Sequence, residues 1–149
     1  MEIMPDRSIF ITGASSGIGL ASALRLSSMG FRVFAGILPG EDLSGLTEGQ
    51  SDRIVIMPVD ITRPEMIGEA RRSIEKATGE GGLYGLFNNA GIAIAGPLEF
   101  MPIEALQQQL DVNVIGHVRV TQAFLPMLRQ ARGRIVNTVS ILGRVATPF

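Results

Sequence analysis

Short apolar runs alternate with longer amphipathic segments along most of the chain. The runs are bounded by Gly, Asn, Asp or Pro, as expected of strands buried in a parallel sheet. The segments between them have helical spacing. The pattern predicts strands at Ser8–Ile11, Phe31–Gly36, Arg53–Val59, Leu83–Phe87 and Arg134–Ser140, and helices at Leu20–Gly30, Pro64–Thr78 and Ile103 to about Arg129. This alternation indicates a single α/β domain, residues 1–149, built on a doubly wound parallel sheet.

Local signals refine the ends of these elements. Thr62 followed by Glu65 three residues later predicts an N-cap with its capping-box partner. Gly116 and Pro126 interrupt the pattern of the long third helix. Residues 38–52 are rich in Gly, Pro, Ser, Asp and Glu, so we expect a surface connection there with room for a short helix.

A glycine-rich turn, Thr12-Gly13-Ala14-Ser15-Ser16-Gly17-Ile18-Gly19, joins the first strand to the first helix. Gly13 suits a tight turn, Gly17 lets the backbone approach a bound pyrophosphate, and Gly19 leaves room for helix and strand to pack. The free N–H groups and dipole of the helix favour an anion. Because no lysine closes the turn, a nucleoside triphosphate is disfavoured. Taken alone, this turn could also have a purely structural role as the connection between a strand and a helix.

Three further segments follow the turn at the ends of predicted strands. They are Asp60-Ile61, Asn88-Asn89-Ala90-Gly91 and Asn137-Thr138-Val139-Ser140. Together with the TGxxxGxG spacing of the turn, they make the whole chain resemble the short-chain dehydrogenase/reductase family. The resemblance implies a Rossmann fold with strand order 3-2-1-4-5, an NAD or NADP cofactor, and hydride transfer between nicotinamide and a carbonyl or secondary alcohol.

The resemblance also assigns cofactor contacts. It implies that Asp60 contacts the adenine ring with Ile61 as an apolar neighbour, and that Asn89, Ala90 and Gly91 stabilise the sheet beside the cofactor. From the residues alone, Asp60 could simply start a turn, and the Asn-Asn pair could cap one locally. The candidate cofactor-binding residues are Gly13, Ser15, Ser16, Gly17, Ile18, Gly19, Asp60, Ile61, Asn89, Ala90 and Gly91.

Two candidate catalytic residues follow from the same resemblance. Ser140 matches the serine that hydrogen-bonds the substrate oxygen, and Asn113 matches the asparagine of the proton-relay network. Apolar neighbours of Asn113 predict that its amide is buried and paired, although a surface position stays open. His117, on the same helix face as Asn113, is interpreted as a packing or solvent-facing residue and not as a general base.

The proton donor of the family is missing from this sequence. A tyrosine, with a lysine four residues further on, should follow Ser140, but the only tyrosine is Tyr84 and the only lysine is Lys76. We therefore expect either an N-terminal fragment of a longer reductase, truncated after the fifth strand, or a cofactor-binding remnant. The fragment is favoured because residues 141–149 continue as an active-site loop would.

Composition narrows the partners. The net charge is −1, without long runs of either sign, so we expect no nucleic-acid and no membrane partner. The chain has no cysteine and one histidine, which excludes disulfides and cysteine- or histidine-rich metal sites.

No apolar stretch approaches the roughly 18 residues of a membrane span, and the first seven residues do not form a signal peptide. The sequence predicts a soluble cytoplasmic protein that acts on a small carbonyl or alcohol and is a homo-oligomer in its full-length form.

Cofactor choice depends on the end of the second strand. Gly36-Ile37-Leu38 offers neither the acidic residue typical of NAD binding nor an arginine for the 2′-phosphate of NADP. Glu41 and Asp42 follow, and their charge would repel that phosphate, which favours NAD. A non-catalytic dinucleotide-binding or regulatory module on the same fold stays open. An FAD- or SAM-binding protein would require neither the Asn-Asn-Ala-Gly segment nor Ser140.

Overall fold

The computed structural model describes residues 7–47 and 52–145. The expectations for Met1–Asp6, for residues 48–51 of the surface connection and for the last four residues lie outside these ranges. The strands are β1 (Ser8–Ile11), β2 (Arg32–Ile37), β3 (Ile54–Pro58), β4 (Gly85–Asn88) and β5 (Arg134–Asn137). The helices are α1 (Gly17–Ser28), α2 (Ser44–Thr47), α3 (Pro64–Thr78), α4 (Ile103–Leu110) and α5 (His117–Gln130). A π-helical segment, Asp111–Gly116, joins α4 to α5, and short 3₁₀ turns lie at Gly79–Gly81, Leu98–Phe100 and Ile141–Gly143.

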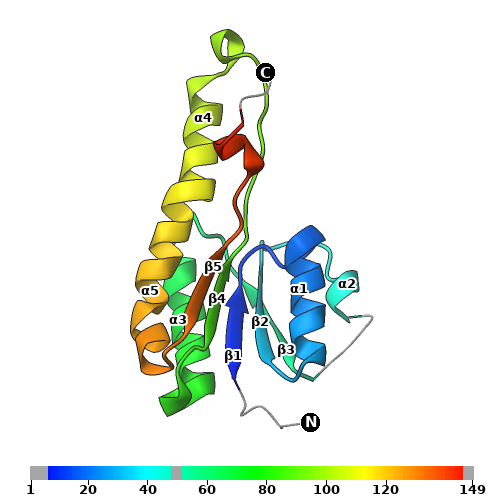
Figure 1. Cartoon of the computed structure of the whole chain (residues 1–149), viewed down its shortest axis with the longest axis vertical. Helices are drawn as coiled ribbons and strands as arrows, with labels where there is room; N and C mark the ends of the chain where they lie inside the picture. The colour runs from blue at the N-terminus through cyan, green and yellow to red at the C-terminus, as the bar shows by residue number, and fades with distance from the viewer. Residues whose placement is uncertain (1–6, 48–51, 146–149) are drawn as a thin grey trace.

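The five strands form one parallel sheet in the order β3-β2-β1-β4-β5. Helices α1 and α2 lie on one face of the sheet and α3 and α5 on the other (Figure 1). This arrangement confirms the predicted doubly wound α/β fold and its strand order. It also places the carboxyl ends of all five strands at one edge, where open sheets of this type bind ligands.

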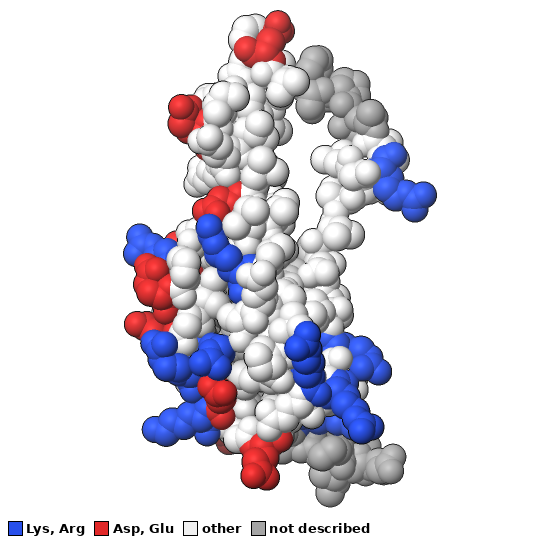
Figure 2. Space-filling view, turned by 90° about the vertical axis from the view of Figure 1, so that its left-hand side faces the viewer, with Lys and Arg blue, Asp and Glu red and all other residues white. Residues whose placement is uncertain are grey.

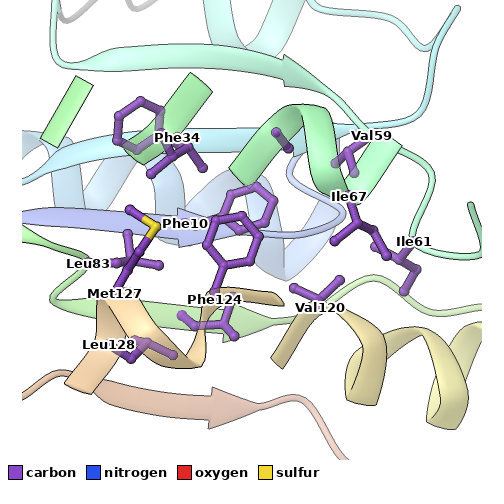
Figure 3. Packing of buried hydrophobic residues seen from close by; sticks show 13 residues of the cluster. Phe10, Phe34, Val59, Ile61, Ile67, Leu83, Val120, Phe124, Met127 and Leu128 are labelled. Atoms are coloured by element: carbon purple, nitrogen blue, oxygen red, sulfur yellow. The ribbon is translucent and has the colours of Figure 1, made fainter. Parts of the chain in front are cut away.

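The central strand β1 supplies side chains to both layers of the core. Phe10 packs on the α3 and α5 side with Phe34 and Phe124, and the rings of Phe10 and Phe124 lie 4.9 Å apart (Figure 3). Ile9 and Ile11 point to the α1 side. The period-two alternation of a strand explains why one four-residue run can be buried throughout and still serve two layers.

Two local predictions are wrong. Thr62 does not cap α3: Arg63 precedes the helix without a side-chain cap, while the Thr62 N–H and hydroxyl donate to Asp60 Oδ1 at 2.9 and 2.7 Å. Pro126 does not interrupt the long helix, because α5 continues through it. The interruption is instead the wider π-helical turn that ends at Gly116, where a Cβ would lie 2.8 Å from the side chain of Ile61.

Within the described ranges, no helix combines the length and the hydropathy needed to cross a bilayer.

Strand β5 forms one edge of the sheet and is exposed along its whole length. Ile135 and Val136, on opposite faces of the strand, are 42% and 55% exposed. An apolar edge with free backbone groups pairs readily with another chain. We therefore expect the purified chain to self-associate at micromolar concentration, as measured by light scattering.

A lysine on the edge is the direct test of that expectation. Val136→Lys should reduce the scattering mass toward that of a monomer, because edge charges oppose strand pairing. Ser73→Lys adds the same charge to an exposed position of α3 and should have no effect. A wild-type chain that stays monomeric would show that the β5 edge does not pair.

Candidate functional site

The glycine-rich turn is tightly packed against the end of β4. Gly13 has a φ of +66°, and a Cβ there would lie 2.7 Å from the Cα of Ala90. A Cβ at Gly19 would overlap the carbonyl oxygen of Gly13 and lie 2.6 Å from Asn89 Nδ2. Gly17, with a φ of +53°, begins α1, three residues earlier than predicted. The N–H groups of the first helical turn, which lack partners inside the helix, therefore belong to the glycine motif itself.

Thr12 and Asn89 join the ends of β1 and β4. The buried Thr12 hydroxyl accepts hydrogen bonds from the N–H groups of Asn89 (3.0 Å) and Ala90 (3.1 Å). In return, the Asn89 side-chain amide donates to the carbonyls of Thr12 (3.2 Å) and Gly13 (2.9 Å). These bonds hold the glycine turn and the segment after β4 as one unit. Sequence reasoning did not assign this role to Thr12.

Asn88 links three elements in place of capping a local turn. Its fully buried Nδ2 donates to Thr121 Oγ1 on α5 (3.0 Å) and to Asn137 Oδ1 on β5 (2.9 Å). Next to it, Asn89 Oδ1 accepts a 2.9 Å hydrogen bond from the Thr138 hydroxyl. The Asn-Asn pair therefore ties β4 to both of its neighbouring strands beside the candidate site.

A cavity of about 460 Å³ lies at the carboxyl edge of the sheet beside the start of α1. It brings together these predicted residues: Gly13, Ser15, Ser16, Asp60, Ile61, Asn89, Ala90 and Gly91. Gly17 and Gly19 lie in the adjoining first turn of α1 without lining the cavity. Ile18 is 61% exposed and lines a different groove, on the α1 side of β4 and β5. Further lining residues that the sequence did not point to are Leu38, Val59, Thr62, Ile92, Gln108, Asp111 and Val112.

The charges around the cavity are acidic. Glu41, Asp60 and Asp111 line it, and none of its described lining residues is Lys or Arg. Asp60 lies 3.7 Å from the Arg63 guanidinium, and Asp111 forms a 2.7 Å ion pair with Arg119. Glu41 accepts a 3.0 Å hydrogen bond from the Leu38 N–H, and no Lys or Arg of the described ranges forms an ion pair with it. The uncompensated negative charge is thus at the end of β2.

Hydrogen bonds from Ser44 stabilise the ionised form of the neighbouring Asp42. The Ser44 N–H and hydroxyl each donate to its carboxylate at 2.9 Å. These hydrogen bonds from Ser44 lower the pKa of Asp42 below its ordinary value. Two acidic residues therefore follow β2, Glu41 lining the cavity and Asp42 bound to Ser44 at the start of α2.

The two predicted catalytic residues lie outside this cavity. Ser140 is exposed, and its hydroxyl accepts a 3.1 Å hydrogen bond from the Leu142 N–H. Asn113 is half-buried, with its amide paired to the N–H (2.9 Å) and carbonyl (2.8 Å) of Ile92. The pairing agrees with expectation, but the predicted burial is only partial: Asn113 and Val112 are half-buried, and the neighbouring Val114 is 49% exposed.

His117 is neither a simple packing residue nor directed to solvent. Its Nε2 lies 2.6 Å from the carbonyl oxygen of Ala90. The interpretation as a packing or solvent-facing residue missed this contact, because its partner lies 27 residues away in the sequence. His117, Asn113 and Thr138 also line a second, more open groove of about 380 Å³ between α5 and β5.

An open parallel sheet with a glycine-rich turn and a cavity at its carboxyl edge defines a nucleotide-binding α/β protein. The sequence profile of the short chain dehydrogenase family matches residues 7–149. The chain therefore belongs to the short-chain dehydrogenase family.

Relatives and solved structures agree with this assignment. Retinol dehydrogenase 5 of Mus musculus is 44% identical over 142 residues, covering 95% of this chain and 45% of that protein. A 17-beta-hydroxysteroid dehydrogenase type 6 of Bos taurus is 42% identical over 144 residues, covering 96% and 45%. The chain thus spans less than half the length of these relatives.

Two solved structures share the fold of nearly the whole chain. A short-chain dehydrogenase from Streptomyces avermitilis superposes with a TM-score of 0.86 at 29% identity, covering 98% of this chain and 53% of that one. An NADPH-bound carbonyl reductase from chicken fatty liver superposes with a TM-score of 0.84 at 29% identity, covering 94% and 62%.

Proposed function

We propose that this chain is the cofactor-binding half of an NAD-dependent oxidoreductase that transfers hydride between nicotinamide and an alcohol or carbonyl. The cavity at the carboxyl edge of the sheet carries the proposal, because the glycine turn, Asp60 and the segment after β4 all face it. The pyrophosphate lies at the start of α1. In this proposal, adenosine lies on the β2–β3 side, near Glu41 and Asp60, and nicotinamide lies on the β4–β5 side, near Gly91 and Ser140. The strand order supports this orientation.

The substrate we propose is an alcohol or carbonyl on a large apolar molecule. Relatives named as retinol and 17-beta-hydroxysteroid dehydrogenases support this class. Apolar side chains around Ser140 also support it, with Val139, Ile141 and Leu142 exposed by 61% or more. Comparing turnover of retinol, a 17β-hydroxysteroid and a short-chain alcohol by the longer protein that includes this chain is the test. A preference for the short alcohol would contradict the proposal.

We also propose a homo-oligomer. An apolar stripe runs along α4 and α5 at helical spacing, on the surface, and it consists of Ile103, Leu106, Leu110, Val114 and Val118. Over α4 the surface is largely uncharged, whereas charges of both signs gather on the lower half of the molecule (Figure 2). A large apolar patch of this kind is typical of an interface. Sedimentation of the longer protein would measure its oligomeric state.

A second candidate function is dinucleotide binding without catalysis. It requires only the glycine turn and the cavity, and both predicted catalytic residues, Asn113 and Ser140, lie outside that cavity. Both functions require the cavity to bind a dinucleotide. Fluorescence titration of the chain with NADH tests that shared step, and the absence of saturable binding would contradict both.

Glu41 provides the sharpest test of the preference for NAD. Its carboxylate would face the 2′-phosphate of NADP, and two charges a few ångströms apart near a surface repel by about 1–4 kcal/mol. We expect Glu41→Gln to tighten NADPH binding about tenfold while the affinity for NADH changes little. Dissociation constants from parallel titrations check this.

Asp42→Asn is the matched control for Glu41→Gln. It removes the same charge one residue further on, at a carboxylate engaged by Ser44 and outside the cavity lining. Its effect on NADPH should be smaller. Tighter binding of NADPH than NADH by the wild-type chain would refute the preference for NAD.

A further inference from the structure

The chain leaves β4 as an extended segment that runs beside α4 in the opposite direction (Figure 1). Exposure alternates along it: Ile92 and Ile94 are partly buried, whereas Gly91, Ala93 and Ala95 are exposed. This period of two is that of a β-strand. In the described part of the chain, however, no strand is paired with this segment. Its inner side faces a helix.

Side chains of three helical residues make the backbone hydrogen bonds that a neighbouring strand would otherwise make with this segment. Gln109 Oε1 accepts a 3.0 Å hydrogen bond from the Ile94 N–H, and Gln109 Nε2 donates to the Ile94 carbonyl at 2.9 Å. Asn113 makes the same pair of bonds with Ile92. His117 Nε2 approaches the Ala90 carbonyl, and since a carbonyl oxygen only accepts, Nε2 carries the proton.

The spacing of these contacts is regular on both sides. Steps of four residues along the helix match steps of two along the extended segment. Four helical residues rise about 6 Å and two strand residues about 6.7 Å, so the two repeats nearly coincide. In a purely α-helical stretch, each four-residue step would rotate about 40° beyond a full turn. The wider π-helical turns at Asp111–Gly116 offset that rotation and keep the three side chains in line.

We propose that Gln109 and His117 are positioning residues that, together with Asn113, hold the Ala90–Ile94 segment as one wall of the dinucleotide cavity. Ala90 is fixed from both sides, its N–H by Thr12 and its carbonyl by His117. Ile92 lines the cavity directly. We call the contacts of Gln109, Asn113 and His117 with this segment the ladder. The ladder sets where the nicotinamide half of the cofactor lies, and this consequence rests on the proposed function.

Residue-resolved amide exchange tests the ladder itself. In Gln109→Ala, exchange of the Ile94 N–H should accelerate about tenfold, as expected for the loss of one hydrogen bond, while the Ile92 N–H should stay protected. Gln107→Ala removes an exposed glutamine of the same helix and is the control. Gln109→Glu keeps an acceptor for the Ile94 N–H and should retain part of its protection. Unchanged exchange of the Ile94 N–H in Gln109→Ala would overturn the ladder.

Binding measurements test the positioning role. ADP reaches only the adenosine and pyrophosphate part of the cavity, whereas NAD⁺ extends to the segment that the ladder holds. Gln109→Ala should weaken NAD⁺ by about tenfold and leave ADP unchanged. Equal weakening of both ligands, or of neither, would overturn the positioning role. If the wild-type chain bound neither ligand, the proposed function would fail, whereas the exchange data would still decide the ladder.

His117 can be followed separately because it is the only histidine in the chain. Imidazole nitrogen chemical shifts should show a proton on Nε2, and that proton should exchange slowly with solvent. His117→Phe keeps a ring but loses the donor, and it should weaken NAD⁺ more than ADP. A wild-type ring with its proton on Nδ1 and none on Nε2 would overturn the assignment of this contact.

Discussion

Replacing Gly17 by valine is expected to raise the dissociation constant for NADH by on the order of a hundredfold or more. Gly17 has a φ of +53°, a conformation that β-branched residues rarely adopt. It is also the first residue of α1, directly after Ser16 in the cavity wall. A valine there would displace the N–H groups proposed to bind the pyrophosphate. Losing two charge-assisted hydrogen bonds, at about 1.5–3 kcal/mol each, accounts for the expected size.

A loss of NADH affinity in Gly17→Val must be distinguished from a loss of folding stability. A Cβ at Gly17 meets no atom of the described residues within 4 Å, so the variant should fold, at a backbone cost of about 1–3 kcal/mol. Gly79→Val is the matched control. Gly79 has a φ of +52°, the space around its Cβ position is equally open, and it lies at the far end of α3. Both variants should have a lower melting temperature than the wild-type chain. Only Gly17→Val should lose affinity for NADH in a calorimetric titration. Equal loss of affinity in both would show that the turn is not the binding site.

The sheet could be predicted from sequence because its signals are local. Apolar runs of strand length alternate with helical segments, and parallel strands joined by helices follow from that order. The bounds of α3 were predicted correctly at Pro64 and Thr78. Proline is preorganised for a first helical turn, and Gly79 adopts the positive φ that ends one.

The details of the site were harder to predict because they depend on contacts between distant segments. Asp60 and Thr62 bond to each other in preference to capping α3, a competition between two local motifs that the sequence does not decide. Gln109 and His117 reach partners 15 and 27 residues away on an extended segment without a strand label. Their spacing of four residues on either side of Asn113 was visible, but the segment that they bind was not. Only the folded chain brings the two repeats together.

The 149 residues alone are expected to lack catalytic activity. We expect the purified chain to reduce carbonyl substrates with NADH no faster than the background reaction. General acid catalysis contributes about 10²–10⁴-fold, and no tyrosine or lysine follows Ser140 to supply the proton. Two polar groups in the groove that Val139 also lines are already engaged: Asn113 binds the Ile92 backbone, and the His117 N–H donates to Ala90.

An assay of NADH oxidation with a steroid ketone and with retinal, using chain freed of host reductases, measures this rate. A second preparation carrying Ser140→Ala identifies contaminants, because activity from a host enzyme would be the same in both. Ser140 is exposed and its hydroxyl caps a 3₁₀ turn, so the substitution should leave the fold and NADH binding intact. Turnover that Ser140→Ala removes would contradict the prediction. It would mean that the serine works with an acid already present among these residues, and His117, released from Ala90, would be the first to examine.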